Sequence, residues 1–465
     1  MIEQNKLIEG NIFKALIGLA LPIMGTSFVQ MAYNMTDMIW IGRVGSKAVA
    51  AVGTAGFFTW LAMAFIMIPK IAAEIGVAQS VGKKDNQSII YYIRHTLQLN
   101  VFFALLYGFI LILLKKQVIG FFNLQDKAVI EMAQSYLTIV SAGMLFYFIN
   151  PVLTGILNGY GESRTPFLIN GIGLITNMIL DPVLIMGIGP FPVMGVKGAA
   201  LATVIAQVVV TTIFLLNIRR KIPVFSQINF FRVPDWNHIR GITKLGLPVA
   251  LQSGLFTVIA MVIARIIAQW GPVPVAVQKV GSQIEAISWM TANGFSTALG
   301  AFVGQNYGAK KWNRIYKGYF TAMGIMCAIG IAATGFLILG AESIFSIFIP
   351  EQEAIAYGIQ YLKILGISQL FMCIEITTAG AFNGLSKTVP PSIVGITFNA
   401  LRIPTALILS SPNLLGLNGI WWSISISSIF KGIVLVTWFG IFLKRQSFRL
   451  KETNIGQGVG NNLMN

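Results

Sequence analysis

The chain has 465 residues, of which 55% are hydrophobic and only 11% charged, and its formal net charge is +17. Soluble domains carry about 25% charged residues, so this composition excludes a water-soluble protein. The basic residues lie in alternate loops rather than beside aromatic residues on one face, which argues against binding to nucleic acid. Cys327 and Cys373 both lie in hydrophobic segments, and we expect no disulfide.

Hydrophobic stretches of about 20 residues, enough to cross a bilayer as a helix, recur between short polar loops. They predict an all-α polytopic membrane protein with twelve transmembrane helices. We place the spans at 15–42, 49–81, 95–114, 130–157, 167–187, 196–218, 242–270, 275–307, 319–340, 354–382, 393–410 and 419–443.

An even number of spans puts both termini on the same side of the membrane. On that side the loops and termini hold 21 Lys and Arg residues, against 6 in the opposite loops. Cytoplasmic loops carry the excess of basic residues. We therefore predict a multi-pass protein of the inner (cytoplasmic) membrane with both termini in the cytoplasm.

The second half of the sequence repeats features of the first half in the same order. The matched positions are Pro22 and Pro248, Gln79 and Gln305, Asn158-Gly159 and Asn383-Gly384, Asn177 and Asn399, Pro182 and Pro404, and Gly195 and Gly416. Because each half has six spans, the two halves insert with the same orientation. This predicts two six-helix bundles related by a pseudo-twofold axis along the membrane normal.

The repeat divides the chain into three parts. We predict an N-lobe at 1–221, a cytoplasmic linker at 222–241 and a C-lobe with a C-terminal tail at 242–465. Phe231 and Trp236 in the basic segment between the lobes indicate a stretch that lies at the membrane interface. Two bundles around a central cleft are typical of carriers that open to either side in turn.

A charged side chain at the centre of a spanning helix raises the free energy of membrane insertion by about 2.5–3.5 kcal/mol. Each such residue in this sequence therefore calls for a structural or functional explanation. In the first half, Asp37, Asp181 and Thr203 all fall about 8–11 Å below the outer boundary, counted at about 1.5 Å per residue. Asn177 precedes Asp181 by four residues and shares its helix face.

Two carboxyl groups, an amide and a hydroxyl at one depth predict a site for a proton or a cation. Burial and a second nearby carboxylate both favour the protonated form of a carboxyl group. The same residues also allow a simpler interpretation, in which each aspartate separately bonds a helix terminus or a lysine. The spacing favours the shared site.

The second half contains other buried charges. Glu285 lies deep in the eighth span with no carboxylate nearby in sequence, while Glu375 and Arg402 on the tenth and eleventh spans could form a buried pair. Such pairs are more often structural than functional. We keep Glu285, Glu375 and Arg402 as candidate charges of the C-lobe or of a central cavity.

Several motifs together resemble the multidrug and toxic compound extrusion (MATE) family. They are the repeated Leu-Gly-Leu-Pro openings, Asp37 ahead of Ile41-Gly42-Arg43, Asn158–Pro166 and Asn177–Pro182, and the likeness runs over residues 10–445. The resemblance implies two six-helix lobes in a V shape. It also implies export of organic cations and drugs by alternating access, in exchange for H⁺, Na⁺ or both.

The same resemblance assigns roles to individual residues. Asp37, Asn177 and Asp181 are implied as the cation or proton site, which would hold Na⁺ if that is the coupling ion, with Thr203 as the hydroxyl partner. Pro22 corresponds to the position where the first helix bends in the family and is implied as a hinge. One departure is that Ser253–Phe256 lacks the glutamate of a NorM-like branch, which argues against a C-lobe sodium site of that type.

Two other functions are weaker alternatives. A flippase for lipids or lipid-linked oligosaccharides belongs to the same wider superfamily, but such proteins carry a cationic cavity, whereas the matched N-lobe site is acidic. An intramembrane enzyme that uses Asp37 and Asp181 as an acid/base pair is disfavoured because Gly-x-Gly-Asp and HExxH sequences are missing. A Walker A sequence is also missing, so we do not expect ATP to drive transport. We expect a monomeric transporter in the lipid bilayer with small organic cations as substrates and no cofactor beyond the coupling ion.

Overall fold

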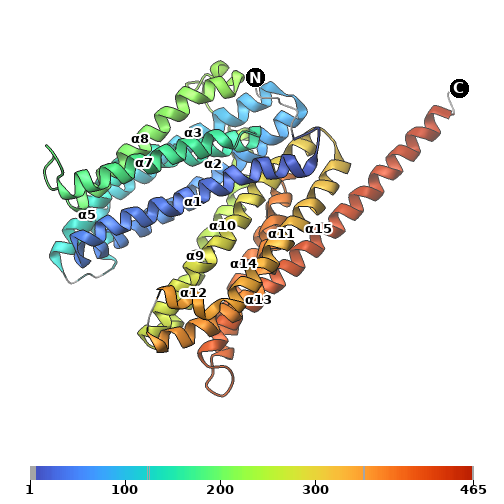
Figure 1. The fold of residues 1–465 in the computed structure, drawn as a ribbon. Helices are drawn as coiled ribbons and strands as arrows, with labels where there is room; N and C mark the ends of the chain where they lie inside the picture. The colour runs from blue at the N-terminus through green and yellow to red at the C-terminus, as the bar shows by residue number, and fades with distance from the viewer. Residues whose placement is uncertain (1–6, 123, 125, 349–350, 463–465) are drawn as a thin grey trace. The chain divides into compact units, whose positions relative to one another are not determined.

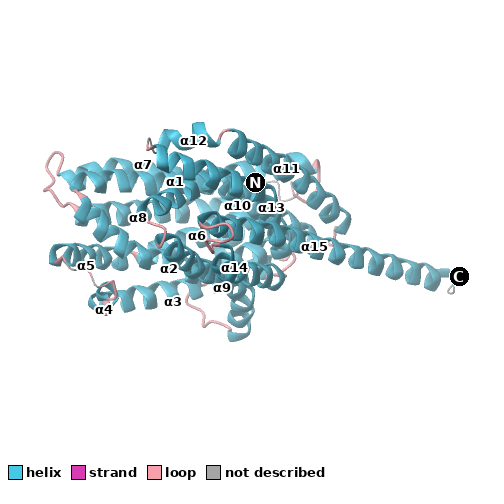
Figure 2. Ribbon diagram, turned by 90° about the horizontal axis from the view of Figure 1, so that it is seen from below, coloured by secondary structure: helices cyan, strands magenta, loops and turns pink. Residues whose placement is uncertain are grey.

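The computed structural model describes residues 7–122, 124, 126–348 and 351–462. Every regular element in these ranges is a helix (Figures 1 and 2). The first half contains α1 (Ile12–Val44), α2 (Ser46–Lys83), α3 (Asn86–Leu113), α4 (Lys115–Gly120), α5 (Lys127–Ala142), α6 (Met144–Tyr160), α7 (Arg164–Met186), α8 (Val196–Lys221) and the 3₁₀ helix η1 (Pro223–Gln227). The second half contains α9 (Trp236–Ala268), α10 (Pro272–Gly308), α11 (Trp312–Leu339), α12 (Ala341–Phe348), α13 (Gln352–Gly384), α14 (Val389–Leu409) and α15 (Leu417–Asn462).

Ten helices in the described part of the chain are long and apolar enough to cross a membrane, and the bent pair α5 and α6 makes an eleventh span. The two helices of this pair meet at an angle of 53°. The remaining predicted span coincides with α10, which is 37 residues long. Its sequence is more polar than that of the other spans because Gln278, Lys279, Gln283 and Glu285 follow one another closely.

Polar caps and left-handed residues set the ends of the helices. Asp85 accepts a hydrogen bond from the backbone N–H of Ser88 at 3.0 Å and so caps the start of α3. Just before it, Lys84 ends α2 with a positive φ of 58°. Lys310, at the matching place in the second half, has the same φ of 58°. Since a non-glycine residue rarely adopts this conformation, the two halves share an unusual backbone geometry as well as residue types.

The chain forms two compact units. The first comprises residues 1–255, 293–315 and 383–389, and the second comprises residues 256–292, 316–382 and 390–465. In the first unit α1 packs against α7 and α7 against α8 (Figure 1), and α2 packs against α6. The lobe bounds expected from the repeat, 1–221 and 242–465 with a linker at 222–241, stay a prediction, because compactness alone does not identify lobes that move as bodies.

Segments from both halves of the sequence meet inside the first unit. A Cβ atom on Gly82 would lie 1.9 Å from the carbonyl oxygen of Gln305, and one on Gly308 would lie 2.1 Å from that of Gln79. Only glycine permits this approach at either position. The Gln79 side chain donates to the carbonyl of Gly384 at 2.8 Å, and the Gln305 side chain donates to the carbonyl of Gly159 at 3.0 Å. We call this reciprocal contact the glycine crossing.

The first described residues also bind to the second half of the sequence within this unit. The guanidinium group of Arg314 donates to the carbonyls of Leu7, Glu9 and Gly10. Lys311 donates to the carbonyl of Ile8 at 3.2 Å. Leu7 and Ile8 are themselves buried. This segment is therefore fixed onto the turn between α10 and α11.

Candidate functional site

The two aspartates predicted to form the cation site lie on α1 and α7, the helices that pack together in the first unit. Asp181 is completely buried and precedes Pro182 inside α7. The side-chain amide of Asn177, one turn earlier, donates to its Oδ1 atom at 3.1 Å. The charge of Asp37 acts on Asp181. The two carboxyl groups therefore share one electrostatic environment, while their joint binding of a proton or a cation stays a prediction.

This environment is rich in hydrogen-bond acceptors that lack donors. Buried polar atoms in proteins are nearly always hydrogen-bonded, yet five here have no partner: Tyr33 OH, Asp37 Oδ1, Asn177 Oδ1, Asp181 Oδ2 and Thr203 Oγ1. Among the described residues no ion pair involves Asp37 or Asp181. Unpartnered carboxyl oxygens in the membrane are costly. A proton or a cation would satisfy them.

Three tyrosines border the aspartates and were not found from the sequence. Tyr33 lies one helical turn before Asp37 on α1, so the i to i+4 spacing could have identified it. Thr203 lies near enough to interact with the Tyr33 hydroxyl, although the two do not reach hydrogen-bonding geometry. Tyr136 on α5 lies within electrostatic range of both aspartates, and Tyr147 on α6 lies within range of Tyr33 and Tyr136. No spacing in the sequence connects these last two with Asp37.

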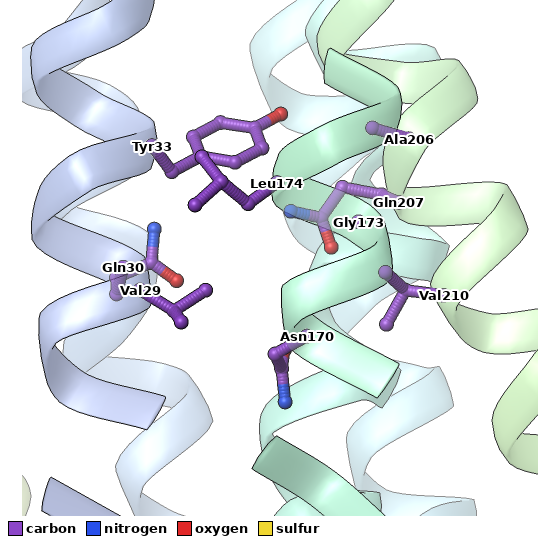
Figure 3. Close-up of a pocket in the computed structure, with 9 residues that line it drawn as sticks. All are labelled: Val29, Gln30, Tyr33, Asn170, Gly173, Leu174, Ala206, Gln207 and Val210. Atoms are coloured by element: carbon purple, nitrogen blue, oxygen red, sulfur yellow. The ribbon is translucent and has the colours of Figure 1, made fainter. Parts of the chain in front are cut away.

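A small polar pocket adjoins Tyr33 between α1, α7 and α8. In Figure 3, Gln30 and Tyr33 on α1 face Asn170 on α7 and Gln207 on α8. Its volume of about 20 Å³ suffices for one water molecule. Asn150 on α6 donates to the Gln207 side chain at 2.6 Å and so fixes one wall. Polar side chains therefore lie beside Tyr33 as well as beside the aspartates, mixed with apolar residues of the same helices.

The oxygen atoms around the aspartates suit the binding of a proton or an alkali cation. Among the described residues no group of three or more His, Cys, Asp and Glu side chains could hold a metal ion. Asp37, Asn177, Asp181 and Thr203 offer only oxygen atoms as acceptors, the ligand type that hard cations prefer. These atoms fit the Na⁺ site implied by the family resemblance, with Na⁺ as a transported ion.

Pro22, the implied hinge, lies inside a continuous α1. The Thr26 hydroxyl donates to the Pro22 carbonyl at 3.0 Å. Since proline has no N–H to donate within the helix, the backbone ladder is weaker at this point. The hinge function stays a prediction.

The candidate charges of the second half form a different kind of cluster, inside the second unit. Glu285 accepts hydrogen bonds from the Tyr361 hydroxyl and from the Gln369 amide. Glu375 pairs with Lys431 at 3.4 Å, and both side chains are buried. Our expectation of a Glu375–Arg402 pair is therefore wrong.

Arg402 instead donates to the hydroxyls of Ser427 at 2.6 Å and Ser428 at 3.2 Å. The charges of Glu285 and Glu375 both act on it. This cluster thus holds two acids and two bases, whereas no ion pair in the described part of the chain involves the aspartates of the first unit. The spacing of residues in the sequence did not identify Lys431 as the partner of Glu375, because the two belong to different helices.

Comparisons with known proteins agree with this arrangement. The MatE family model matches residues 22–183 and 248–408, one stretch in each half of the chain. A probable multidrug resistance protein NorM of Thermotoga maritima is 28% identical over 92% of each chain. The probable multidrug resistance protein YpnP of Bacillus subtilis is 26% identical over 91% of this chain and 93% of its own.

The fold also matches solved structures. A multidrug resistance MATE family transporter of the MOP superfamily, solved in an outward-facing conformation, aligns with a TM-score of 0.87 over 96% of this chain and 98% of its own, at 23% identity. This likeness confirms the predicted all-α, twelve-helix membrane fold. Since the family model covers more than half of the chain in two repeated stretches, the protein is a multi-pass membrane transporter, not an enzyme, and belongs to the MatE (multidrug and toxic compound extrusion) family.

Proposed function

We propose that this protein exports organic cations and drugs from the cytoplasm by alternating access, in exchange for H⁺ or Na⁺. The observation that carries the proposal is the acceptor-rich site around Asp37 and Asp181, which has two carboxyl groups and no basic partner among the described residues. The names of the multidrug resistance relatives support the substrate class. The excess of basic residues supports an inner-membrane protein with both termini in the cytoplasm.

In the proposed cycle, H⁺ or Na⁺ enters the aspartate site from outside and cancels part of its negative charge. The packing of α1 against α7 then changes, with Pro22 and Pro182 as weak points in the two helices. The organic cation loses its electrostatic attraction and leaves outward. Release of the ion toward the cytoplasm restores the charge. Antiport needs only that the ion and the drug stabilise different states of one two-state element.

The first test is transport of ethidium by the monomeric protein in proteoliposomes, with a pH gradient or a sodium gradient imposed separately. We expect one gradient or both to drive uptake in the wild type and neither to drive it in Asp37→Asn. Asp126→Asn is the matched control, because it removes an exposed carboxylate that pairs with Lys47 and retains an Asn cap. Normal gradient-driven transport by folded Asp37→Asn would refute the coupling site.

A lipid or lipid-linked oligosaccharide flippase is the second candidate. The observation in its favour is Arg402, a buried cation that is bound by two serine hydroxyls rather than by a carboxylate at ion-pair distance. If the wild type moves no cation under either gradient but translocates a fluorescent lipid-linked saccharide, the flippase replaces the antiporter.

A further inference from the structure

The segment between α8 and α9 is fixed against α3 within the first unit. The side-chain amide of Gln98 donates to the carbonyl of Phe230 at 2.9 Å and to that of Arg232 at 2.8 Å. The backbone N–H of Asp235 donates to Nε2 of His95 at 3.2 Å. Val224 and Phe225 of the same segment are buried. These contacts make the segment a fixed platform rather than a free loop.

The only two histidines of the sequence meet at this platform. The rings of His95 and His238 stack with centroids 5.0 Å apart, and Tyr91 stacks on His238 at the same distance. Because a backbone N–H can only donate, Nε2 of His95 is an acceptor, and its Nδ1–H donates to the Tyr91 carbonyl at 2.8 Å. His95 is therefore held as a neutral ring, and Tyr91 and His238 form an aromatic wall beside it.

A pocket of about 180 Å³ lies beside this wall between α3 and α9. Asn237 and His238 supply polar groups at the start of α9, and Ile242 and Leu245 supply apolar surface one and two turns further along. α9 is one of the candidate membrane spans. The pocket thus changes from polar to apolar along a helix that enters the membrane, which matches the order of a headgroup and an acyl chain.

The surface around the pocket has the composition of a membrane-binding face. Three large apolar side chains of the platform project into solvent: Phe231 is 99% exposed, Val233 82% and Trp236 80%. Aromatic residues of this kind are typical of the membrane interface. The same stretch of sequence carries five exposed cations, namely Arg219, Arg220, Arg232, Arg240 and Lys244. The one acid of the platform, Asp235, is hydrogen-bonded through its Oδ2 atom to Nδ1 of His238 at 2.9 Å.

We propose that this pocket and platform bind an anionic phospholipid of the adjacent leaflet. Arg232 and Arg240 attract the phosphate-bearing headgroup, the side-chain amide of Asn237 donates hydrogen bonds to it, and the acyl chains follow Ile242 and Leu245. Phe231 and Trp236 enter the interface beside it. Each cation near an anionic membrane surface contributes about 1 kcal/mol of attraction, so several of them select an anionic lipid over a zwitterionic one.

The test is native mass spectrometry of the full-length protein extracted from vesicles of equal parts phosphatidylglycerol and phosphatidylcholine. We expect the wild type to retain phosphatidylglycerol preferentially. Arg232→Gln with Arg240→Gln should reduce that preference roughly tenfold or more. The control pair Lys116→Gln and Lys127→Gln removes two exposed charges elsewhere and should leave it unchanged.

A second variant blocks the pocket without removing charge. A Cβ atom on Gly241 would meet nothing within 4 Å, so Gly241→Leu fills the pocket with no backbone clash. We expect it to lose one bound phosphatidylglycerol, while Gly324→Leu, on a similarly open helix surface, retains it. Equal retention of both lipids by the wild type would overturn the proposal. So would unchanged preference in both the arginine variant and Gly241→Leu.

Trp236 provides a measurement that does not depend on extraction. We take its fluorescence as the difference between the wild type and Trp236→Phe in phosphatidylcholine vesicles that contain a brominated lipid. We expect stronger quenching by brominated phosphatidylglycerol than by brominated phosphatidylcholine at equal content. Absence of quenching by either lipid would show that the platform does not touch the membrane.

Discussion

The two halves of this repeated chain differ in whether their buried acidic side chains are paired with basic ones. In the first half, Asp37 and Asp181 share one environment and have no basic partner among the described residues. At the matching offsets the second half has Ile263 and Ile403. Its own acids lie elsewhere, and Glu375 is paired with Lys431. Duplication thus supplied one scaffold twice, but among the described residues the buried carboxyl oxygens without a partner are those of Asp37 and Asp181 in the first copy.

This difference separates charge that can respond to an ion from charge that is already neutralised. An unpaired carboxyl group gains a great deal when it binds a proton or a cation, because nothing else satisfies it. A buried ion pair gains little from a further cation. We therefore expect ion coupling in the first half and a structural role for the Glu375–Lys431 pair in the second.

The largest expected difference is in transport, between a variant that removes an acid of the first half and one that removes an acid of the second half. We expect Asp181→Asn to reduce gradient-driven ethidium transport tenfold or more, because it removes a carboxyl oxygen that has no other partner. Glu285→Gln should change transport less than about twofold, since Tyr361 and Gln369 can still bond a neutral side chain. Initial rates in proteoliposomes compare the two. A larger loss in Glu285→Gln would reverse the assignment of the coupling site.

The next effect concerns stability. Lys431→Met should destabilise the protein by about 3–5 kcal/mol, because it leaves the buried Glu375 without its partner. The double variant Glu375→Gln with Lys431→Met should recover most of that loss. Thermal unfolding of the purified protein in detergent measures both. If the double variant is no more stable than the single one, the pair does not act as a compensated unit.

The glycine crossing should tolerate no side chain. We expect Gly82→Ala to destabilise the protein by about 1–3 kcal/mol, because its Cβ would lie 1.9 Å from the Gln305 carbonyl oxygen. Gly56→Ala on the same helix α2 is the control, since nothing lies within 4 Å of that position. Equal melting temperatures for the two variants would mean that the crossing can separate at little cost.

The smallest effect concerns a turn that differs between the halves. The cap residue Asp85 has Lys311 as its counterpart, and Lys311 binds the carbonyl of Ile8 instead of capping α11. Hydrogen bonds from the side chain and backbone of Ser88 lower the pKa of the Asp85 carboxyl group. We expect Asp85→Ala to cost about 1 kcal/mol at neutral pH.

The lowered pKa of Asp85 determines how the stability difference between the wild type and Asp85→Ala changes with pH. The ionised cap contributes its stability above the ordinary pKa of an aspartate and loses it as the pH falls through the lower folded value, below about pH 4. The difference in melting temperature between the wild type and Asp85→Ala should therefore shrink on acidification. Asp85→Asn, which keeps a cap without a charge, should stay close to the wild type in acid. A constant difference down to about pH 3 would contradict the role of the charge.

The sequence predicts most of the fold because hydropathy and loop charge reflect the bilayer directly. The bent pair α5 and α6 was predicted as one span, and even the polar α10 was found from its length. The depth of Asp37 and Asp181 along their helices predicts a shared site, and the packing of α1 against α7 agrees with that prediction. Residue counts do not record rotation about a helix axis or the pairing of distant helices, so Tyr136 and the Glu375–Lys431 pair could not be derived.

The glycine crossing also bears on how the two halves could diverge after duplication. Each glycine there approaches the backbone carbonyl of the other half's glutamine, so a substitution in one copy disturbs the backbone of the other. A single constraint therefore applies to Gln79, Gln305 and the glycines that follow them. No such constraint applied to Asp37 and its counterpart Ile263, which now differ in residue type. At the positions where the two halves contact each other, substitutions in one half had to be compatible with the residues of the other half.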